Sequence, residues 1–205
     1  NVYYPSDANP DLISNKVVAI VGYGNQGRAQ ALNMRDSGVK HIIIGSRHDT
    51  SWNKANEDGF ETFSIAEASE KADIIFMLLP DEVAPQVYHE SIEPYLKPGD
   101  VLNFSSGYNI IYKHIVPPAF VDVVMVGPRM IGEGVREMFT RGEGFATFLS
   151  VAQDSTGNAK EIAKALAMAM GSKKGAIEVS FEDETYLDLM SEQGTWPQIG
   201  RASCR

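Results

Sequence analysis

Short apolar runs typical of buried strands recur along the chain, and segments with helical periodicity separate them. The apolar runs are KVVAIV, HIIIGSR, ADIIFMLLP, DVLNFSS, VDVVMVGP, GFATFLSVA and GAIEVSF. Helices are expected from about Asn25, from Trp52 to about Gly59, from Val135 to Arg141 and from Gly157 to Met170. The segment EVAPQVYHESIEPYL is also expected to be helical, with interruptions at Pro85 and Pro94. This alternation predicts an α/β fold, a mostly parallel sheet with helices on both faces.

The pattern changes near the end of the chain. After Phe181 the segment EDETYLDLMSEQ predicts a helix that opens a second domain, so we expect a first domain over residues 1–181 and the start of another over 182–197. The last eight residues, QIGRASCR, correspond to the translation of a sequence that resembles a sequencing-library adapter. We therefore expect residues 198–205 to carry no functional information and the gene to continue past Pro197; an ordinary polar tail is the alternative.

Composition excludes several classes of protein. The 205 residues carry a formal net charge of −9, with 43% hydrophobic and 22% charged residues, which is ordinary for a globular domain. A net negative chain lacks the clustered Lys and Arg that phosphate backbones require, so we expect no nucleic-acid partner. No apolar run approaches the roughly 20 residues that span a bilayer, which argues against a membrane partner. A single cysteine, Cys204, excludes a disulfide framework, and these features together favour the cytoplasm.

A glycine-rich turn joins the first apolar run to a helical segment. It reads Gly22-Tyr23-Gly24-Asn25-Gln26-Gly27. In this G-x-G-x-x-G spacing Gly22 permits the tight turn, Gly24 lets the backbone approach a pyrophosphate, and Gly27 lets the helix pack closely on the sheet. The start of the helix offers free N–H groups and the positive end of its dipole to phosphates. The turn predicts a Rossmann-like dinucleotide-binding domain in which all six residues are candidate cofactor contacts.

The residues after the second apolar run bear on which dinucleotide binds. NAD-binding proteins usually place Asp or Glu there, about 20 residues past the glycines, to bind the ribose 2′-hydroxyl. This chain has Arg47 instead, and Arg47, Thr50 and Ser51 can hold a 2′-phosphate through a guanidinium and two hydroxyls. Asp49 would repel that phosphate, and a solvated loop arginine is the alternative interpretation of Arg47. We favour NADP(H) as the cofactor.

Several longer segments carry a family resemblance. They are VYY, VGYGNQGRAQALNMRDSG, SWNKA, ADIIFMLLPDE, PPAFVDVVMVGP, VREMFTRGEGFATFLSVAQD and DETYLDLMSEQ, in order from about Val2 to Gln193. Together they resemble ketol-acid reductoisomerase. The resemblance implies an N-terminal NADPH-binding domain and an all-α, knotted, metal-binding C-terminal domain that forms the dimer core. It also implies two Mg²⁺ ions, a 2-acetohydroxy acid substrate from branched-chain amino-acid biosynthesis, and a homodimer or higher oligomer for the intact protein.

The resemblance also implies roles for individual residues. Asp188 and Glu192 match the Mg²⁺ ligands of the family's D-L-x-x-E-Q motif. Positions i and i+4 share a helix face and Mg²⁺ prefers carboxylate oxygens, although spacing alone would favour a solvated helix face. Gly132 matches a glycine near the cofactor, with a simple turn as the alternative. At the carboxyl end of the third strand, where a nucleotide would lie, the family pattern places Asp81, Glu82, Val83 and Ala84.

Two residues depart from the family pattern at positions expected to be catalytic. Ser106 stands where the family has an active-site histidine, and a hydroxyl cannot act as a base near pH 7. Arg129 replaces a lysine, which keeps the positive charge but changes its shape. Three hypotheses follow: a fragment of a ketol-acid reductoisomerase, an NADP(H)-dependent 2-keto or 2-hydroxy acid reductase without isomerase activity, and a non-catalytic dinucleotide-binding paralogue. We expect the fragment alone to be inactive.

Overall fold

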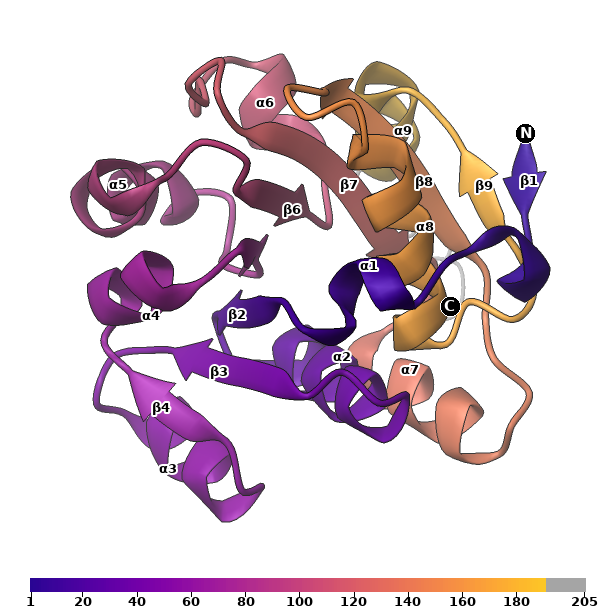
Figure 1. The fold of residues 1–205 in the computed structure, drawn as a ribbon, viewed down its shortest axis with the longest axis horizontal. Helices are drawn as coiled ribbons and strands as arrows, with labels where there is room; N and C mark the ends of the chain where they lie inside the picture. Colours follow the sequence, from indigo (N-terminus) through magenta and orange to yellow (C-terminus); the bar gives the residue numbers. More distant parts are fainter. Residues whose placement is uncertain (191–205) are drawn as a thin grey trace, which may run out of the picture.

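A computed structural model describes residues 1–190, and in this range a nine-stranded sheet forms the centre of the fold (Figure 1). The strands are β1 (Val2–Tyr3), β2 (Val17–Val21), β3 (His41–Gly45), β4 (Glu61–Phe63), β5 (Ile74–Met77), β6 (Val101–Phe104), β7 (Asp122–Pro128), β8 (Thr147–Gln153) and β9 (Ala176–Glu178). Their order across the sheet is β1-β9-β8-β7-β6-β5-β2-β3-β4. The strands from β4 to β7 in this order are all parallel, whereas β7 pairs with β8, and β1 with β9, in antiparallel fashion. The predicted mostly parallel sheet is confirmed.

Helices cover both faces of this sheet, as expected. They are α1 (Asp11–Ser14), α2 (Asn25–Asp36), α3 (Thr50–Glu57), α4 (Ile65–Lys71), α5 (Ala84–Ser91), α6 (Tyr108–Ile111), α7 (Gly132–Thr140), α8 (Ala159–Met170) and α9 (Phe181–Leu189), with 3₁₀ turns at Pro5–Asp7 and Glu93–Tyr95. None of the helices within residues 1–190 has the length and apolar character needed to cross a membrane.

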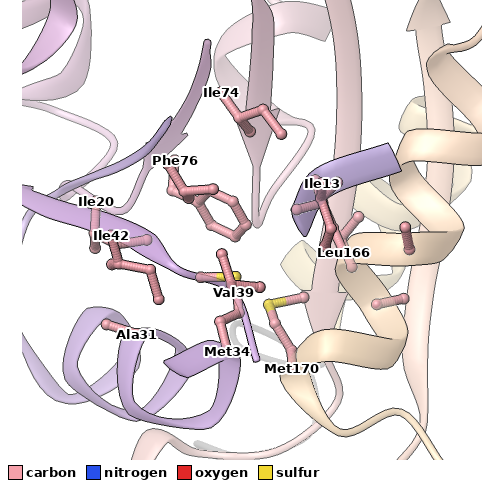
Figure 2. Close-up of a cluster of buried hydrophobic side chains, with 14 of the residues drawn as sticks. Ile13, Ile20, Ala31, Met34, Val39, Ile42, Ile74, Phe76, Leu166 and Met170 are labelled. Carbon is pink, nitrogen blue, oxygen red and sulfur yellow. The ribbon is translucent and has the colours of Figure 1, made fainter. Parts of the chain in front are cut away.

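Each face of the sheet has its own apolar core, because parallel strands that are buried on both sides carry apolar residues at successive positions. On one face Ile20 and Phe76 from the sheet meet Met34 of α2 and Leu166 and Met170 of α8 (Figure 2). On the other face β-strand residues pack against α4, α5 and the start of α9, with Tyr88, Leu102 and Phe181 among the buried side chains. Full burial of one such side chain contributes roughly 1.5–3 kcal/mol. The two cores hold the carboxyl ends of the strands in a fixed arrangement.

Proline positions differ from expectation in one place. Pro85 does not interrupt a helix, because it lies in the first turn of α5, where its missing N–H has no intrahelical acceptor to lose. Pro94 lies within the 3₁₀ turn Glu93–Tyr95, which begins after α5 has ended at Ser91. The helix predicted after Phe181 is present as α9, while its assignment to a second domain stays a prediction. Glu192 and residues 198–205 lie outside the described residues.

Candidate functional site

A cleft of about 620 Å³ opens at the carboxyl ends of the central strands. It lies where the strand order reverses, since the chain runs outward from β2 to β3 and β4 and then returns to the other side of β2 as β5. Ligands of open α/β sheets bind at such a switch point. The residues predicted for the site that line the cleft are Gly22, Tyr23, Gly24, Asn25, Gln26, Gly27, Arg47, Ser51, Asp81, Val83, Ala84 and Ser106.

The three glycines of the turn have separate structural roles. Gly22 has a φ of +95°, and a Cβ there would collide with the carbonyl oxygen of Leu78 on the neighbouring β5 segment. A Cβ on Gly27 would collide with the carbonyl oxygen of Gly22. By contrast, a Cβ on Gly24 would meet no atom within 4 Å, so Gly24 presents bare backbone to open space at the cleft wall. This is the arrangement that lets a pyrophosphate approach the start of α2, whose first amides have no intrahelical acceptor.

Two residues of the turn line the cleft but make their side-chain hydrogen bonds to residues outside it. Tyr23 is only 3% exposed, and its hydroxyl donates to Oδ2 of Asp58 at 2.9 Å. Burial raises the pKa of Tyr23, and the hydrogen bond to Asp58 raises it further. Gln26 donates from Nε2 to the carbonyl oxygen of Met130 at 2.8 Å, which ties the turn to the loop before α7. These two residues contribute to the cleft mainly by fixing its backbone.

The wall after β3 carries the residues predicted to select the dinucleotide. Arg47 and Ser51 line the cleft, whereas Thr50, the first residue of α3, does not. Asp49 also lines the cleft and caps α3, since its Oδ1 accepts from the amides of Ser51 at 2.9 Å and Trp52 at 3.3 Å. The amides at the helix start counter part of the negative charge that Asp49 brings to this wall.

The wall after β5 and β6 contains both predicted and unpredicted residues. Asp81 accepts a hydrogen bond at 3.1 Å from Nδ2 of Asn109, a cleft residue in α6 that was not predicted from the sequence. Ser106 accepts from the amide of Tyr108 at 3.3 Å. Glu82, in the first turn before α5, does not line the cleft.

A charged cluster lies beyond this wall, where α9 meets β7. Nη1 of Arg129 is 3.6 Å from Oε1 of Glu184 and 3.5 Å from Oδ1 of Asp188. The Arg129 guanidinium also lies over the ring of Phe148, 4.5 Å from its centre. Glu184 is only 2% exposed, and burial raises its pKa, while the hydrogen bond from the Gly107 amide and the charge of Arg129 act in the opposite direction. Glu184 was not predicted from the sequence.

Gly107 explains how α9 comes so close to the strand ends. Its amide donates to Oε2 of Glu184 at 2.8 Å, and a Cβ at this position would lie 2.5 Å from both the Phe181 carbonyl oxygen and Oγ1 of Thr185. Because Gly107 follows β6 and Arg129 follows β7, α9 crosses the same edge of the sheet as the cleft. Asp188 therefore lies at this edge with a third of its side chain exposed, and its role as a metal ligand stays a prediction. Its predicted partner Glu192 falls outside the described residues, and residues 1–190 contain no group of three or more His, Cys, Asp or Glu arranged to hold a metal.

Gly132 does not line the cleft but supports it from behind. A Cβ there would lie 2.5 Å from the carbonyl carbon of Asn25 and 2.8 Å from the amide nitrogen of Gln26. The start of α7 thus rests directly on the backbone of the glycine-rich turn. Gly132 therefore packs against a turn that is predicted to bind the cofactor, and its own place near the cofactor stays a prediction.

The sheet order, the switch point and the glycine-rich turn at that point together define a dinucleotide-binding domain of the Rossmann type. Comparison with known families is more specific. The family model described as "Acetohydroxy acid isomeroreductase, NADPH-binding domain" matches residues 12–176, and the chain belongs to this family.

Individual relatives agree with this assignment. A ketol-acid reductoisomerase (NADP(+)) of Pyrococcus abyssi is 53% identical over 194 residues, which cover 94% of this chain and 58% of the relative. The structure of an NADH-preferring ketol-acid reductoisomerase from an uncultured archean has a TM-score of 0.92 and 42% identity, covering 95% of this chain and 61% of that one. The chain thus spans about three fifths of the length of these relatives. A semialdehyde dehydrogenase NAD-binding protein from Cupriavidus necator shares the fold alone, with a TM-score of 0.76 at 13% identity over 92% of this chain and 72% of that one.

Proposed function

We propose that this chain is the NADP(H)-binding part of a ketol-acid reductoisomerase. The intact enzyme would convert a 2-acetohydroxy acid by Mg²⁺-dependent alkyl migration and NADPH-dependent reduction, in the biosynthesis of branched-chain amino acids. The observation that carries the proposal is the shared edge of the sheet, where the glycine-rich turn and the Arg129–Glu184–Asp188 cluster both lie. For the intact protein we propose a homodimer or higher oligomer in the cytoplasm.

The cleft residues fit a dinucleotide with a 2′-phosphate. The open face of Gly24 and the start of α2 would receive the pyrophosphate, while the guanidinium of Arg47 and the hydroxyl of Ser51 would hold the 2′-phosphate at the wall after β3. The nicotinamide, when bound, supplies the hydride. Thr50 and Glu82 stay predicted contacts, since neither reaches the cleft here.

The residues near α9 fit Mg²⁺ in their chemistry. Asp188 offers the hard carboxylate oxygens that Mg²⁺ prefers, and it lies at the edge of the sheet where it can be reached from the cleft side. Mg²⁺, when bound, polarises ketone and alkoxide oxygens. Arg129 holds a positive charge 3.5 Å from Asp188 and thereby keeps α9 against β7. We propose Asp188 and Glu192 as ligands on this basis.

Dinucleotide binding tests the proposed cofactor site, and turnover of 2-acetolactate tests the proposed reductoisomerase activity. Titration of the 205-residue chain with NADPH and NADH, followed by nucleotide fluorescence, should show binding with a preference for NADPH. The substitution Arg47→Gln should reduce that preference, while Lys54→Gln, on the exposed side of α3, should not. The full-length protein should convert 2-acetolactate in the presence of Mg²⁺, and absence of that activity from a folded protein that binds NADPH would refute the reductoisomerase assignment.

One observation favours a second function. None of the four histidines lines the cleft, and Ser106 occupies the position where an imidazole is expected. A reductase of 2-keto or 2-hydroxy acids needs no isomerisation step, so it tolerates this serine more easily. Full-length protein that reduces 3-hydroxy-2-ketoacids but does not convert 2-acetolactate would establish this second function. Binding of NADPH with turnover of neither would leave a non-catalytic paralogue.

A further inference from the structure

We propose that Asp58 is a positioning residue of the dinucleotide site, which ties the glycine-rich turn to α3 and so fixes the separation of two walls of the cleft. Asp58 does not line the cleft itself. The inference rests on the proposed dinucleotide binding and goes beyond it, because it names a residue outside the cleft that sets the geometry within it.

Four residues surround Asp58 and form what we call the Asp58 junction: Tyr23, Arg28, Arg35 and Phe60. Arg28 binds the Asp58 carboxylate with two nitrogens, Nε at 2.6 Å from Oδ2 and Nη2 at 2.8 Å from Oδ1. Tyr23 donates to Oδ2 at 2.9 Å, and Arg35 donates to the Asp58 carbonyl oxygen at 2.6 Å. Phe60 completes the junction, with the Arg35 guanidinium 4.8 Å from its ring centre and the Tyr23 ring edge-on at 6.0 Å.

The members of the junction come from the glycine-rich turn, from α2 and from the segment at the end of α3, and only Tyr23 among them lines the cleft. Tyr23 belongs to the glycine-rich turn, while Arg28 and Arg35 lie seven residues apart on α2 and therefore on one helix face. Asp58 is the C-terminal cap of α3, and the other end of this helix carries the cleft residues Asp49 and Ser51. A helix of eight residues is a rod of roughly 12 Å, so anchoring its far end sets the direction in which its near end points.

The pairing of Arg28 supports a positioning role over a ligand role. A cation on the second turn of α2 stands close to where phosphates would bind, and by charge alone it would be a candidate phosphate contact. Instead one edge of its guanidinium, formed by Nε and Nη2, binds Asp58 in the bidentate geometry that gives direction as well as charge. The carboxylate is held ionised, because the hydrogen bonds from Arg28 lower the pKa of Asp58. This ion pair therefore holds the end of α3 against α2.

Two substitutions separate this role from simple electrostatics. Tyr23→Phe removes the link to the turn without changing charge, and Asp58→Asn removes the charge while keeping the shape. Loss of a negative charge near a polyanion would by itself tighten binding, so weaker binding in Asp58→Asn reports lost geometry. Glu57→Gln is the matched control, since it removes an equal charge from the adjacent, exposed position.

The experiment measures dissociation constants of NADPH and NADH for each variant of the 205-residue chain, together with the fluorescence anisotropy of Trp52. Trp52 lies on α3 and stacks on His48 with ring centres 3.9 Å apart, and Trp196→Phe leaves it as the single tryptophan. We expect Tyr23→Phe and Asp58→Asn each to weaken binding of both dinucleotides by about fivefold, the equivalent of one net hydrogen bond. Trp52 anisotropy should fall, and the double variant should be no weaker than Asp58→Asn alone, because both act through one junction.

The inference would be overturned if folded Asp58→Asn and Tyr23→Phe chains bind NADPH and NADH as tightly as wild type, or more tightly. This holds even if their melting temperatures fall, because the junction would then contribute to stability and not to dinucleotide binding. If Asp58→Asn does not fold, Tyr23→Phe decides, since it leaves the Asp58–Arg28 pair intact. A wild-type chain that binds neither NADPH nor NADH would overturn the proposed cofactor binding and this inference with it. Binding by wild type with no effect of either variant would overturn the inference only.

Discussion

The contact between α7 and the glycine-rich turn makes Gly132→Ala a sharp test of how the cleft is built. The added methyl would lie 2.5 Å from the carbonyl carbon of Asn25, 2.6 Å from its oxygen and 2.8 Å from the amide nitrogen of Gln26. All three are backbone atoms in the first turn of α2, so no side-chain rotation can relieve the overlap. Either α7 or the turn has to move.

The change in folding free energy caused by Gly132→Ala is the sum of two opposing contributions. Forcing an extra methyl into a packed site typically costs about 1–3 kcal/mol. Alanine is favoured over glycine in a helix by up to about 1 kcal/mol, although less at the first position of α7 than in its interior. We expect a net loss of about 1–2 kcal/mol, which for a chain of this size lowers the melting temperature by about 2–8 °C. Because the displaced atoms belong to the turn, NADPH binding should weaken as well.

The chain offers its own control in Gly134→Ala. This position lies on the same helix, but the added methyl would meet Cγ and Sδ of Met130 at 2.8 Å, and a methionine side chain can rotate away. Gly134→Ala should therefore leave the melting temperature unchanged or raise it slightly, with normal NADPH binding. Thermal unfolding by circular dichroism and NADPH titration decide the matter. Equal melting temperatures for the two variants would refute the claim that α7 supports the turn through Gly132.

Three further substitutions have definite expected outcomes. Hydrogen bonds from Lys160, Tyr3 and Asn1 hold the pKa of Glu178 at about 2, below its usual 4.5. This carboxylate therefore stabilises the fold above pH 4.5 and loses that contribution as the pH falls toward 2. Melting temperatures of wild type and Glu178→Gln should differ at pH 7 and converge in acid. Asp49→Ala removes the cap of α3 and should cost about 1 kcal/mol in chemical denaturation, while shifting dinucleotide preference further toward NADPH. Arg129→Gln leaves the buried Glu184 without its cation and should cost about 1–3 kcal/mol, whereas Arg141→Gln, at an exposed ion pair, should cost no more than about 1 kcal/mol.

The order of strands and helices could be predicted because most of them have strong local signals. Strands buried on both faces, such as β2 and β5, are continuous apolar runs, and the glycine-rich turn marks where α2 begins. The segments that were missed have weaker signals. Strand β4 has three residues, none of them fully buried, at the edge of the sheet, and α6 has only four residues. Helix α4 did carry a signal, since Ser64 and Glu67 form a capping box at its start.

The site was predictable where its residues are close in sequence and unpredictable where packing brings distant residues together. The turn from Gly22 to Gly27 is a local motif, and all its residues line the cleft. The pairing of Arg129 with Glu184 joins residues that lie far apart in sequence and depends on the absence of a side chain at Gly107. Likewise, no pattern in the sequence indicates that Asp58 receives hydrogen bonds from Tyr23 and Arg28. Such contacts depend on how helices and sheet pack against one another. No short stretch of a single sequence specifies that packing.

The two departures from the family pattern have different physical consequences. A guanidinium is planar, so Arg129 can lie flat on Phe148 while one of its nitrogens stays within 3.6 Å of both Glu184 and Asp188. The positive charge that a lysine would supply between β7 and α9 is therefore kept, and it is held in place by an aromatic face that suits arginine. Ser106 has no comparable compensation, because its hydroxyl accepts a hydrogen bond from the Tyr108 amide and cannot titrate near neutral pH. Arg129 thus keeps a positive charge beside α9 at the cleft edge, whereas Ser106 offers no group that exchanges a proton near neutral pH. For this reason turnover of 2-acetolactate, more than cofactor binding, is the decisive measurement for this protein.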